Sequence, residues 1–284
     1  MLAAWRRRFW RADPDRLRAF EGLRPVTVVT GGSEGIGFAL ADRFAAGGDD
    51  ILLVARDEAR LAKAAETLRS RHQVKVFVFA LDLSVPEAIP HLDVQLTSMH
   101  AYCDKLINAA GIGLAGDFAT HDPTALGRLI DLNIKTLTAF TRYYLPGMLI
   151  RGAGGILNVA SLGGYAPGPY QAAYYASKAY VISLTEALAH ECAGHGLRIS
   201  VLCPGPVRTA FHARMGGETG LYLRLMPVAT PEAVARIAYR RYRLGQRVII
   251  PGLVNTLMMP VLRVLPHRVL SPIVSTLLRP RKPS

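Results

Sequence analysis

The segment "AAYYASKAY", residues 172–180, places two adjacent tyrosines ahead of one lysine. On a helix, Lys178 shares a face with Tyr174 four residues earlier and with Tyr175 three residues earlier. A nearby ammonium group favours phenolate and lowers the pKa of a phenol from about 10, so such a tyrosine can exchange a proton near neutral pH. Spacing alone does not choose between the two rings. It also fits two packed rings with a lysine that reaches past them to water.

A second group of residues could hold a phosphate. The segment "TGGSEGIG", residues 30–37, follows the β-branched run "VTVVT" and opens a periodic helical stretch at 38–46. Glycines allow a tight turn and a close approach of the backbone, and the helix N-terminus offers unpaired N–H groups and a partial positive charge. Four glycines in this strand, turn and helix context predict dinucleotide binding rather than an ordinary turn.

The end of the next strand bears on which dinucleotide binds. The strand "ILLVA" is followed by Arg56 and Asp57. An acidic residue at this position binds the free ribose 2′-hydroxyl of NAD, whereas an arginine can pair with the 2′-phosphate of NADP. We therefore expect Arg56 to favour NADP(H). Two alternatives stay open: Asp57 could take this position if the strand ends slightly later, or Arg56 could be a solvated strand terminus.

These motifs lie on alternating strands and helices. Strands are expected at 26–30 and 51–55, from Val74, in "DKLINAAG", in "GGILNVAS" and in "LRISVLCPG". Helices are expected at 57–71, after "HDPTALGRLIDLNIKTL" and in "AYYASKAYVISLTEALAHEC". Such alternation predicts an α/β fold, a doubly wound parallel sheet of the Rossmann type in a single domain, with ligands at the carboxyl ends of the strands. We divide the chain into a basic N-terminal extension at 1–23, a dinucleotide-binding and catalytic domain at 24–252, and a hydrophobic, basic tail at 253–284.

Composition limits the partners. The 284 residues carry a net charge of +13, concentrated in "WRRRFWR", "YRRYR" and "RPRK" beside apolar and aromatic residues. This arrangement favours an anionic membrane surface over nucleic acid, although a solvated basic face would look the same. Three cysteines and eight histidines show no metal-ligand spacing, so we expect no metal, no disulfide framework and a cytoplasmic protein. The segment "MLAAW" lacks the apolar core of a signal peptide, so we expect the N-terminus to be uncleaved. The apolar run "VIIPGLVNTLMMPVL" is too short and too interrupted by proline for a span of about 20 residues.

Five motifs in a fixed order resemble those of the classical short-chain dehydrogenases/reductases. They are "TGGSEGIG", "NAAG" at 108–111, Ser161, "YYASK" and "PGPVRT" at 204–209. The resemblance covers about residues 24–252, and the glycine spacing is that of the classical members. Ser161 lies thirteen residues before Tyr174, the interval that the family pattern expects. The resemblance therefore selects Tyr174 over Tyr175 for chemistry.

The resemblance also implies a role for each matching residue. Tyr174 is the acid/base, Lys178 lowers its pKa and bonds the nicotinamide ribose, and Ser161 positions the substrate oxygen. Asn133, in "DLNIKT", holds a water in a proton relay behind Lys178. The expected cofactor contacts, beside Arg56, Tyr174 and Lys178, are Gly31, Ser33, Gly35, Ile36 and Gly37 in the glycine motif, Asp82 and Leu83 at the adenine, Asn108, Ala109, Ala110 and Gly111 beneath the cofactor, and Pro204, Gly205, Val207 and Thr209 over the nicotinamide.

The leading hypothesis is an NADP(H)-dependent oxidoreductase of a small apolar carbonyl or secondary alcohol, 3-oxoacyl or steroid-like. Its pocket would lie under a mobile lid at 206–228. The alternative is a non-catalytic NADP(H)-binding module that docks on a membrane or partner. The tail could contact a membrane, as expected of a peripheral protein, or fold over the pocket, or join subunits of a homo-oligomer.

Overall fold

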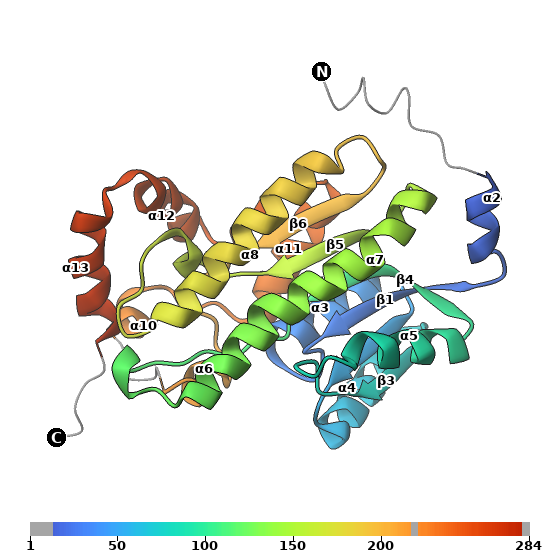
Figure 1. Ribbon diagram of the computed structural model, residues 1–284, viewed down its shortest axis with the longest axis horizontal. Helices are drawn as coiled ribbons and strands as arrows, with labels where there is room; N and C mark the ends of the chain where they lie inside the picture. The colour runs from blue at the N-terminus through green and yellow to red at the C-terminus, as the bar shows by residue number, and fades with distance from the viewer. Residues whose placement is uncertain (1–13, 217–220, 280–284) are drawn as a thin grey trace.

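Buried strands form the centre of the protein. The structure, a computed structural model, describes residues 14–216 and 221–279. All residues from Val26 to Thr30 and from Gly155 to Val159 are buried, as expected for a parallel sheet covered on both faces. Seven parallel strands form one sheet in the order β3-β2-β1-β4-β5-β6-β7 (Figure 1). They are β1 (Arg24–Thr30), β2 (Ile51–Ala55), β3 (Val76–Ala80), β4 (Ala101–Asn108), β5 (Gly155–Val159), β6 (Arg198–Leu202) and β7 (Val248–Ile249).

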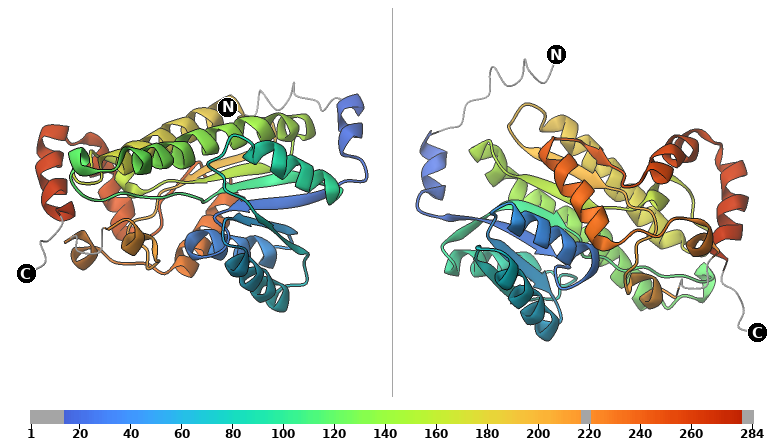
Figure 2. Two further views of the ribbon diagram at one scale, coloured as in Figure 1. Left: turned by 60° about the horizontal axis from the view of Figure 1, so that its bottom comes forward. Right: turned by 180° about the vertical axis from the view of Figure 1, so that it is seen from behind.

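Helices cover both faces of this sheet, which completes the doubly wound α/β architecture (Figure 2). One face carries α3 (Gly35–Ala46), α4 (Glu58–Arg71) and α11 (Pro231–Arg243). The other carries α5 (Ala88–Ser98), α7 (Leu137–Arg151) and α8 (Ala172–Glu191). Two of these helices begin at side-chain caps: the Asp57 carboxylate accepts from the Arg60 N–H at the start of α4, and the Thr230 hydroxyl accepts from the Ala233 N–H at the start of α11, which has Pro231 in its first turn.

Six further α-helices lie in the described part of the chain. They are α2 (Pro14–Leu17), α6 (Pro123–Ile130), α9 (Phe211–Arg214), α10 (Tyr222–Leu225), α12 (Leu253–Val264) and α13 (His267–Leu278). Helices α12 and α13 lie at one end of the molecule, and α2 lies at the other (Figure 1). The basic segment "WRRRFWR" falls outside the described residues.

The structure corrects three expected element boundaries. Residues 248–249, which begin the apolar run "VIIPGLVNTLMMPVL" and for which no strand was expected, form the seventh strand, with Val201 opposite Val248 in the ladder. The third strand begins at Val76 rather than Val74. The helical region expected after "HDPTALGRLIDLNIKTL" already begins at Pro123, because Asp122 accepts hydrogen bonds from the Thr124 and Ala125 N–H groups. The strand of Val248 and Ile249 has only two residues, too few to show the alternation that identifies a strand, so the sequence pattern alone could not separate it from the apolar run that follows.

The strand order reverses between β1 and β4: from β1 the chain adds β2 and β3 on one side, and from β4 it adds β5, β6 and β7 on the other. Thr30 at the end of β1 lies opposite Asn108 at the end of β4. Ligands of open α/β sheets bind at such a reversal, beyond the carboxyl ends of the strands. The motifs singled out from the sequence converge on this edge.

Candidate active site

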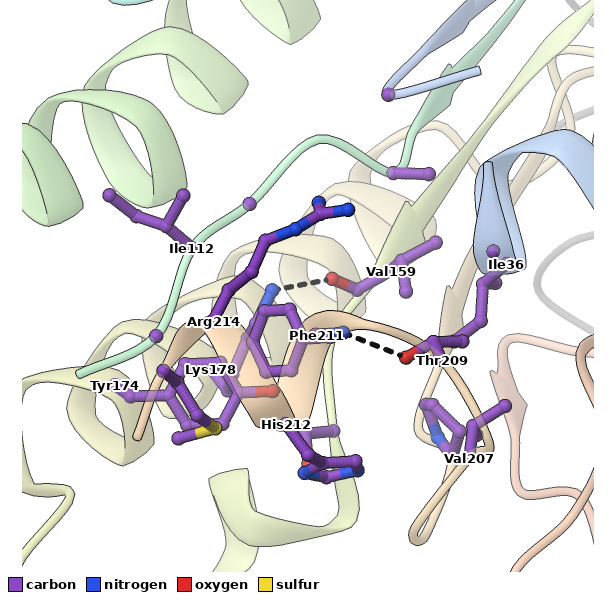
Figure 3. A pocket seen from close by; sticks show the side chains of 18 of the residues that line it. Ile36, Ile112, Val159, Tyr174, Lys178, Val207, Thr209, Phe211, His212 and Arg214 are labelled. Atoms are coloured by element: carbon purple, nitrogen blue, oxygen red, sulfur yellow. Dashed lines mark hydrogen bonds between the residues drawn. The ribbon is translucent and has the colours of Figure 1, made fainter. Parts of the chain in front are cut away.

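A cavity with a volume of about 630 Å³ lies at the carboxyl ends of β1, β4, β5 and β6. It is lined by the glycine turn, by the segments that follow these strands, and by residues within 204–215 together with Tyr222 and Met226. The two C-terminal helices form its far wall, so the tail folds over the pocket. Figure 3 shows side chains from these segments pointing into the cavity, among them Tyr174, Lys178 and Phe211.

The glycine turn packs closely against the end of β4. Gly31 has φ +66°, and a Cβ atom there would lie 2.9 Å from the Ala110 backbone. A Cβ at Gly37 would lie 2.2 Å from the Gly31 carbonyl oxygen. Larger side chains at these two positions would therefore displace the backbone of the turn.

Helix α3 begins in this turn without a side-chain cap, because its N-cap residue Glu34 makes no capping hydrogen bond. The first N–H groups of α3 therefore lie beside the cavity, which Ser33, Gly35 and Ile36 line. Together with the positive end of the helix dipole, this arrangement suits a pyrophosphate. The geometry of the turn is therefore compatible with the pyrophosphate cradle that the glycine pattern predicts.

The Glu34 side chain is used elsewhere. Its carboxylate pairs with Arg60 at 3.2 Å and with Arg214 of α9. The hydrogen bond from Arg214 is the main reason that the pKa of Glu34 is lowered. This ion pair joins the lid segment to the glycine turn across the mouth of the cavity.

The adenosine end of the cavity contains the residues that bear on cofactor choice. Arg56 follows the last residue of β2 and lines the cavity with Asp57, Asp82 and Leu83. The Asp57 carboxylate accepts from the Arg60 N–H and pairs with the Arg60 guanidinium at 3.0 Å. Asp57 is therefore engaged as a helix cap and paired with Arg60, while the side chain of Arg56 makes no such bond with the described residues and lies beside it at the cavity.

Asp82 is held in place by Ser84. Its carboxylate accepts from the Ser84 N–H at 2.9 Å and from the Ser84 hydroxyl at 2.7 Å. These bonds, with a contribution from the Arg56 charge, lower the pKa of Asp82. The neighbouring Leu83 is buried, and its carbonyl accepts from the Thr136 hydroxyl.

Ser161, Tyr174 and Lys178 meet where β5 and α8 approach each other. The Lys178 ammonium group donates to the Val159 carbonyl at 3.0 Å and lies 5.7 Å from the centre of the Tyr174 ring. The Ser161 oxygen accepts from the Gly163 N–H at 3.1 Å, so its own O–H can donate toward Tyr174 or a ligand. This arrangement brings a hydroxyl, a phenol and an ammonium group to one wall of the cavity.

The two adjacent tyrosines have different surroundings. A Cβ atom added at Gly163 would lie 2.8 Å from the Tyr175 ring. A Cβ atom added at Gly168 would lie 2.2 Å from the same ring. Tyr175 therefore lies packed between two glycine segments, and it also contacts the cluster formed by α13. Tyr174 instead stacks at 5.4 Å on Phe211 of the lid. Both rings line the cavity, but Tyr174 contacts Phe211 whereas Tyr175 packs against Gly163 and Gly168, so the choice of Tyr174 as the reactive tyrosine stays a prediction.

The pKa values correct one expectation. Burial raises the pKa of the Tyr174 phenol well above its ordinary value, and the hydrogen bond with Ser161 offsets only part of this rise. Burial also lowers the pKa of Lys178 to about 8. In the protein alone burial sets the direction of the shift, so the pKa of Tyr174 lies above its ordinary value and not below it as expected.

Two of the expected site residues lie behind the cavity wall rather than on it. Asn133 is buried in the π-helical turn Asp131–Thr136; its amide accepts from the Ile112 N–H, and donates to the Ile112 carbonyl and to the Ser177 hydroxyl. Asn108 is also buried and donates to Asn158 at 2.8 Å. Asn133 still lies close to Lys178, because a Cβ at Gly111 would approach both side chains, at 3.2 Å and 3.5 Å.

The other strand-end residues line the cavity as expected. The Thr30 hydroxyl accepts from the Ala109 and Ala110 N–H groups, which fixes the segment that ends at Gly111. On the opposite side, the cavity is lined by Pro204, Gly205, Val207 and Thr209. A Cβ at Gly35 would lie 3.3 Å from the Thr209 side chain, so this loop closes directly over the glycine turn.

The sequence reasoning did not single out several residues that line the cavity. Gln171, three residues before Tyr174, is buried. Its side-chain nitrogen has no hydrogen-bond partner within ordinary distance. The same side chain nevertheless interacts with the Tyr222 hydroxyl and lowers the pKa of that phenol. The Tyr222 hydroxyl lies 2.9 Å from the His212 ring nitrogen. Helical spacing from Tyr174 could have identified Gln171. The distant pocket residues Met258, Leu262, Val274, Leu277 and Leu278 give no local signal.

Among residues 14–216 and 221–279, no group of three or more histidine, cysteine, aspartate or glutamate side chains could hold a metal ion. The chemistry of the cavity is that of a hydroxyl, a phenol and a buried amine beside a dinucleotide cradle. These are the groups needed for hydride transfer with a nicotinamide cofactor, where the protein adds orientation and a proton.

Comparisons with known proteins show the family of the chain. The family model for short chain dehydrogenases matches residues 25–218. An uncharacterised oxidoreductase of Staphylococcus saprophyticus is 35% identical over 73% of this chain and 88% of its own, and a ketoacyl reductase of Nostoc is 30% identical over 74% and 72%. A short-chain dehydrogenase from Sphingobium yanoikuyae, solved in complex with NADPH, has a TM-score of 0.74 at 30% identity over 86% of this chain and 96% of its own. The protein therefore belongs to the short-chain dehydrogenase/reductase family and is an oxidoreductase that acts on an alcohol or carbonyl group with NAD(P)H.

Proposed function

We propose that this protein is an NADP(H)-dependent oxidoreductase that reduces the carbonyl group of an apolar substrate, of the 3-oxoacyl or steroid-like class, or oxidises the matching secondary alcohol. The observation that carries this proposal is the wall of the cavity beyond Tyr174. It consists of apolar side chains from the lid and the tail: Phe211, Met215, Met226, Met258, Leu262, Val274, Leu277 and Leu278. A mostly apolar wall with a few polar groups is what an apolar substrate with one reacting oxygen requires.

The preference for NADP(H) rests on Arg56. It lines the adenosine end of the cavity, and the carboxylate that could replace it, Asp57, is engaged with Arg60. A guanidinium group can pair with the 2′-phosphate through charge-assisted hydrogen bonds. The relative solved with NADPH supports the same choice.

The proposed roles follow from the contacts. When bound, the nicotinamide supplies the hydride that reduces the carbonyl carbon. Tyr174 donates its phenolic proton to the carbonyl oxygen, and the Ser161 hydroxyl steadies the charge that develops there. The phenol is protonated at neutral pH, because an ordinary phenol has a pKa of about 10 and burial raises the pKa of Tyr174 further, so it carries the proton that is transferred. Lys178, fixed by the Val159 carbonyl, binds the nicotinamide ribose, with Asn133 behind it.

The test is a comparison of carbonyl substrates by following NADPH consumption. We expect a 3-oxoacyl ester or a steroid ketone to be reduced with a higher kcat/KM than a small polar hydroxyketone. Tyr174→Phe should lower turnover by about 10² to 10⁴, since it removes the transferable proton, while NADPH affinity stays within about three-fold. Tyr175→Phe is the matched control and should be mild, because Tyr175 is packed between Gly163 and Gly168.

Three results would contradict the proposal. Faster reduction of the polar hydroxyketone would exclude the apolar substrate class. Loss of turnover in Tyr175→Phe but not in Tyr174→Phe would show that the site is assigned to the wrong ring. NADPH binding without reduction of any carbonyl, or oxidation of any alcohol, would instead support a non-catalytic NADP(H)-binding module.

A further inference from the structure

The C-terminal helix pair, α12 and α13, is apolar on two sides. Both helices are 12 residues long and are joined by Leu265 and Pro266. A surface helix of a globular protein normally has one apolar face toward the core and a polar face toward water. A helix that is apolar all round is normally buried or in contact with lipid. The outer side of this pair therefore needs an explanation.

The inner side of the pair belongs to the pocket. Met258 and Leu262 of α12 line the cavity, as do Val274 and Leu278 of α13. Leu270, Val274 and Leu278 follow one another at intervals of four residues and form a buried cluster with Tyr175 and Tyr222. The inner face is therefore already occupied by contacts within the chain.

The outer side of α12 is a second apolar stripe. It consists of Leu253, Leu257, Val261 and Val264, at intervals of three or four residues, with exposed fractions of 75%, 66%, 51% and 80%. Val269 and Ile273 continue the exposed apolar surface on α13. None of these six residues, which we call the outer stripe, is a member of the buried clusters of the described chain.

The charge around the outer stripe has one sign. From residue 233 to residue 284 the sequence contains no aspartate or glutamate. The helix pair and the residue after it carry Arg263, His267, Arg268 and Arg279, all exposed. Apolar side chains beside basic ones, without acidic residues, complement the surface of an anionic bilayer.

The length of the helices limits how they could meet a bilayer. A helix of 12 residues is about 18 Å long, shorter than the hydrocarbon core of about 30 Å. Within residues 14–216 and 221–279, no helix has the length and apolar character to cross a membrane. Contact would therefore be in the plane of the headgroups, where an amphipathic helix buries only its apolar face.

We propose that the outer stripe docks the protein on an anionic phospholipid bilayer, and that the inner face of the same helices receives an apolar substrate from that bilayer. Only the second part rests on the proposed function. A second copy of this chain fits the surface less well. In a two-fold interface the same patch meets itself, so Arg263 and Arg268 would face like charges. Glu186, the acidic partner of Arg263, lies on α8 of the same chain.

The test measures sedimentation of the full-length protein with phosphatidylglycerol-containing vesicles and with pure phosphatidylcholine vesicles. We expect binding to the anionic vesicles that weakens with salt. The double variant Leu257→Asp, Val264→Asp should lose at least about ten-fold in partitioning, because it places carboxylates in the stripe. Its matched control is Leu244→Asp, Val94→Asp, two side chains that are 76% and 69% exposed elsewhere and should bind as the wild type does.

Arg268→Gln tests the electrostatic part and should weaken binding by about five-fold on anionic vesicles only. None of these substitutions lies at the cavity, so NADPH binding should be unchanged and shows that each variant is folded.

Three outcomes would overturn the docking surface. The wild type could fail to bind anionic vesicles, or the stripe and control variants could bind equally. Alternatively, the stripe variant could convert a wild-type dimer into a monomer without vesicles, which would assign the stripe to a second copy of the chain. The vesicle assay uses no substrate, so failure of the proposed carbonyl chemistry would not alter its result.

Discussion

Lys178 should make the stability of the protein depend on pH in a characteristic way. Its side chain is buried with the Val159 carbonyl as its hydrogen-bond acceptor, and burial lowers its pKa from 10.5 to about 8. A shift of this size corresponds to about 3 kcal/mol against the protonated form in the folded state. Below pH 8 this whole free-energy cost lowers the stability of the fold, because Lys178 is protonated in both the folded and the unfolded state. Between pH 8 and 10.5 the unfolded state binds more protons than the folded state, so the free energy of unfolding rises with pH.

The measurement is denaturant unfolding of the wild type and Lys178→Met, without cofactor, across this range. The variant lacks the buried amine, so its stability relative to the wild type should fall by about 2 kcal/mol between about pH 7 and about pH 10. Lys135→Met is the matched control: Lys135 is exposed and pairs with Asp131, so its difference from the wild type should change little. If the Lys178→Met and wild-type curves ran parallel, burial would not be perturbing Lys178 and the reasoning would be refuted.

Three further predictions concern the cradle and the pocket. Arg56→Ala should weaken NADPH binding by about ten-fold or more and leave NADH almost unchanged, measured by fluorescence titration; equal losses would exclude a 2′-phosphate contact. Gly37→Ala should lower the free energy of unfolding by about 1–3 kcal/mol, because its Cβ would meet the Gly31 carbonyl, whereas Gly127→Ala in α6 has open space and should be neutral or slightly stabilising in thermal denaturation. Gln171→Leu should raise KM more for substrates with a second oxygen than for simple ketones, and equal changes would show that its amide contacts no substrate.

Local patterns predicted the parts of the site that are continuous in the sequence. The glycine turn could be identified because strand, turn and helix follow one another within a few residues, and each leaves its own periodicity. Ser161, Tyr174 and Lys178 were grouped by the family resemblance, because helical spacing alone did not choose between the two tyrosines; in the fold, the segment between β5 and α8 brings the three groups to one wall of the cavity. In such segments the chain has little freedom, so spacing along the sequence translates into proximity in space.

Features set by distant contacts could not be read in this way. β7 has two residues, and it is a strand only because β6 offers a free edge beside it. The pKa of Tyr174 is governed by how completely the lid and α8 exclude water, which no spacing reveals. The tail left three readings open because its residues are apolar on both sides of each helix. Only the fold shows that one side faces the cavity and the other does not.

The position of the tail also bears on how the catalytic helix is held. Tyr170 has φ +64°, a left-handed conformation that costs about 1–3 kcal/mol for such a residue unless its surroundings impose it. Its carbonyl accepts from the Gly116 N–H, and its hydroxyl accepts from Arg279 at the end of α13. Gln171 follows at once as the N-cap of α8, whose first turn carries Tyr174. Contacts from the tail therefore help to fix the start of the helix that presents the reactive phenol, so the element proposed to meet the bilayer is also one that orients the chemistry.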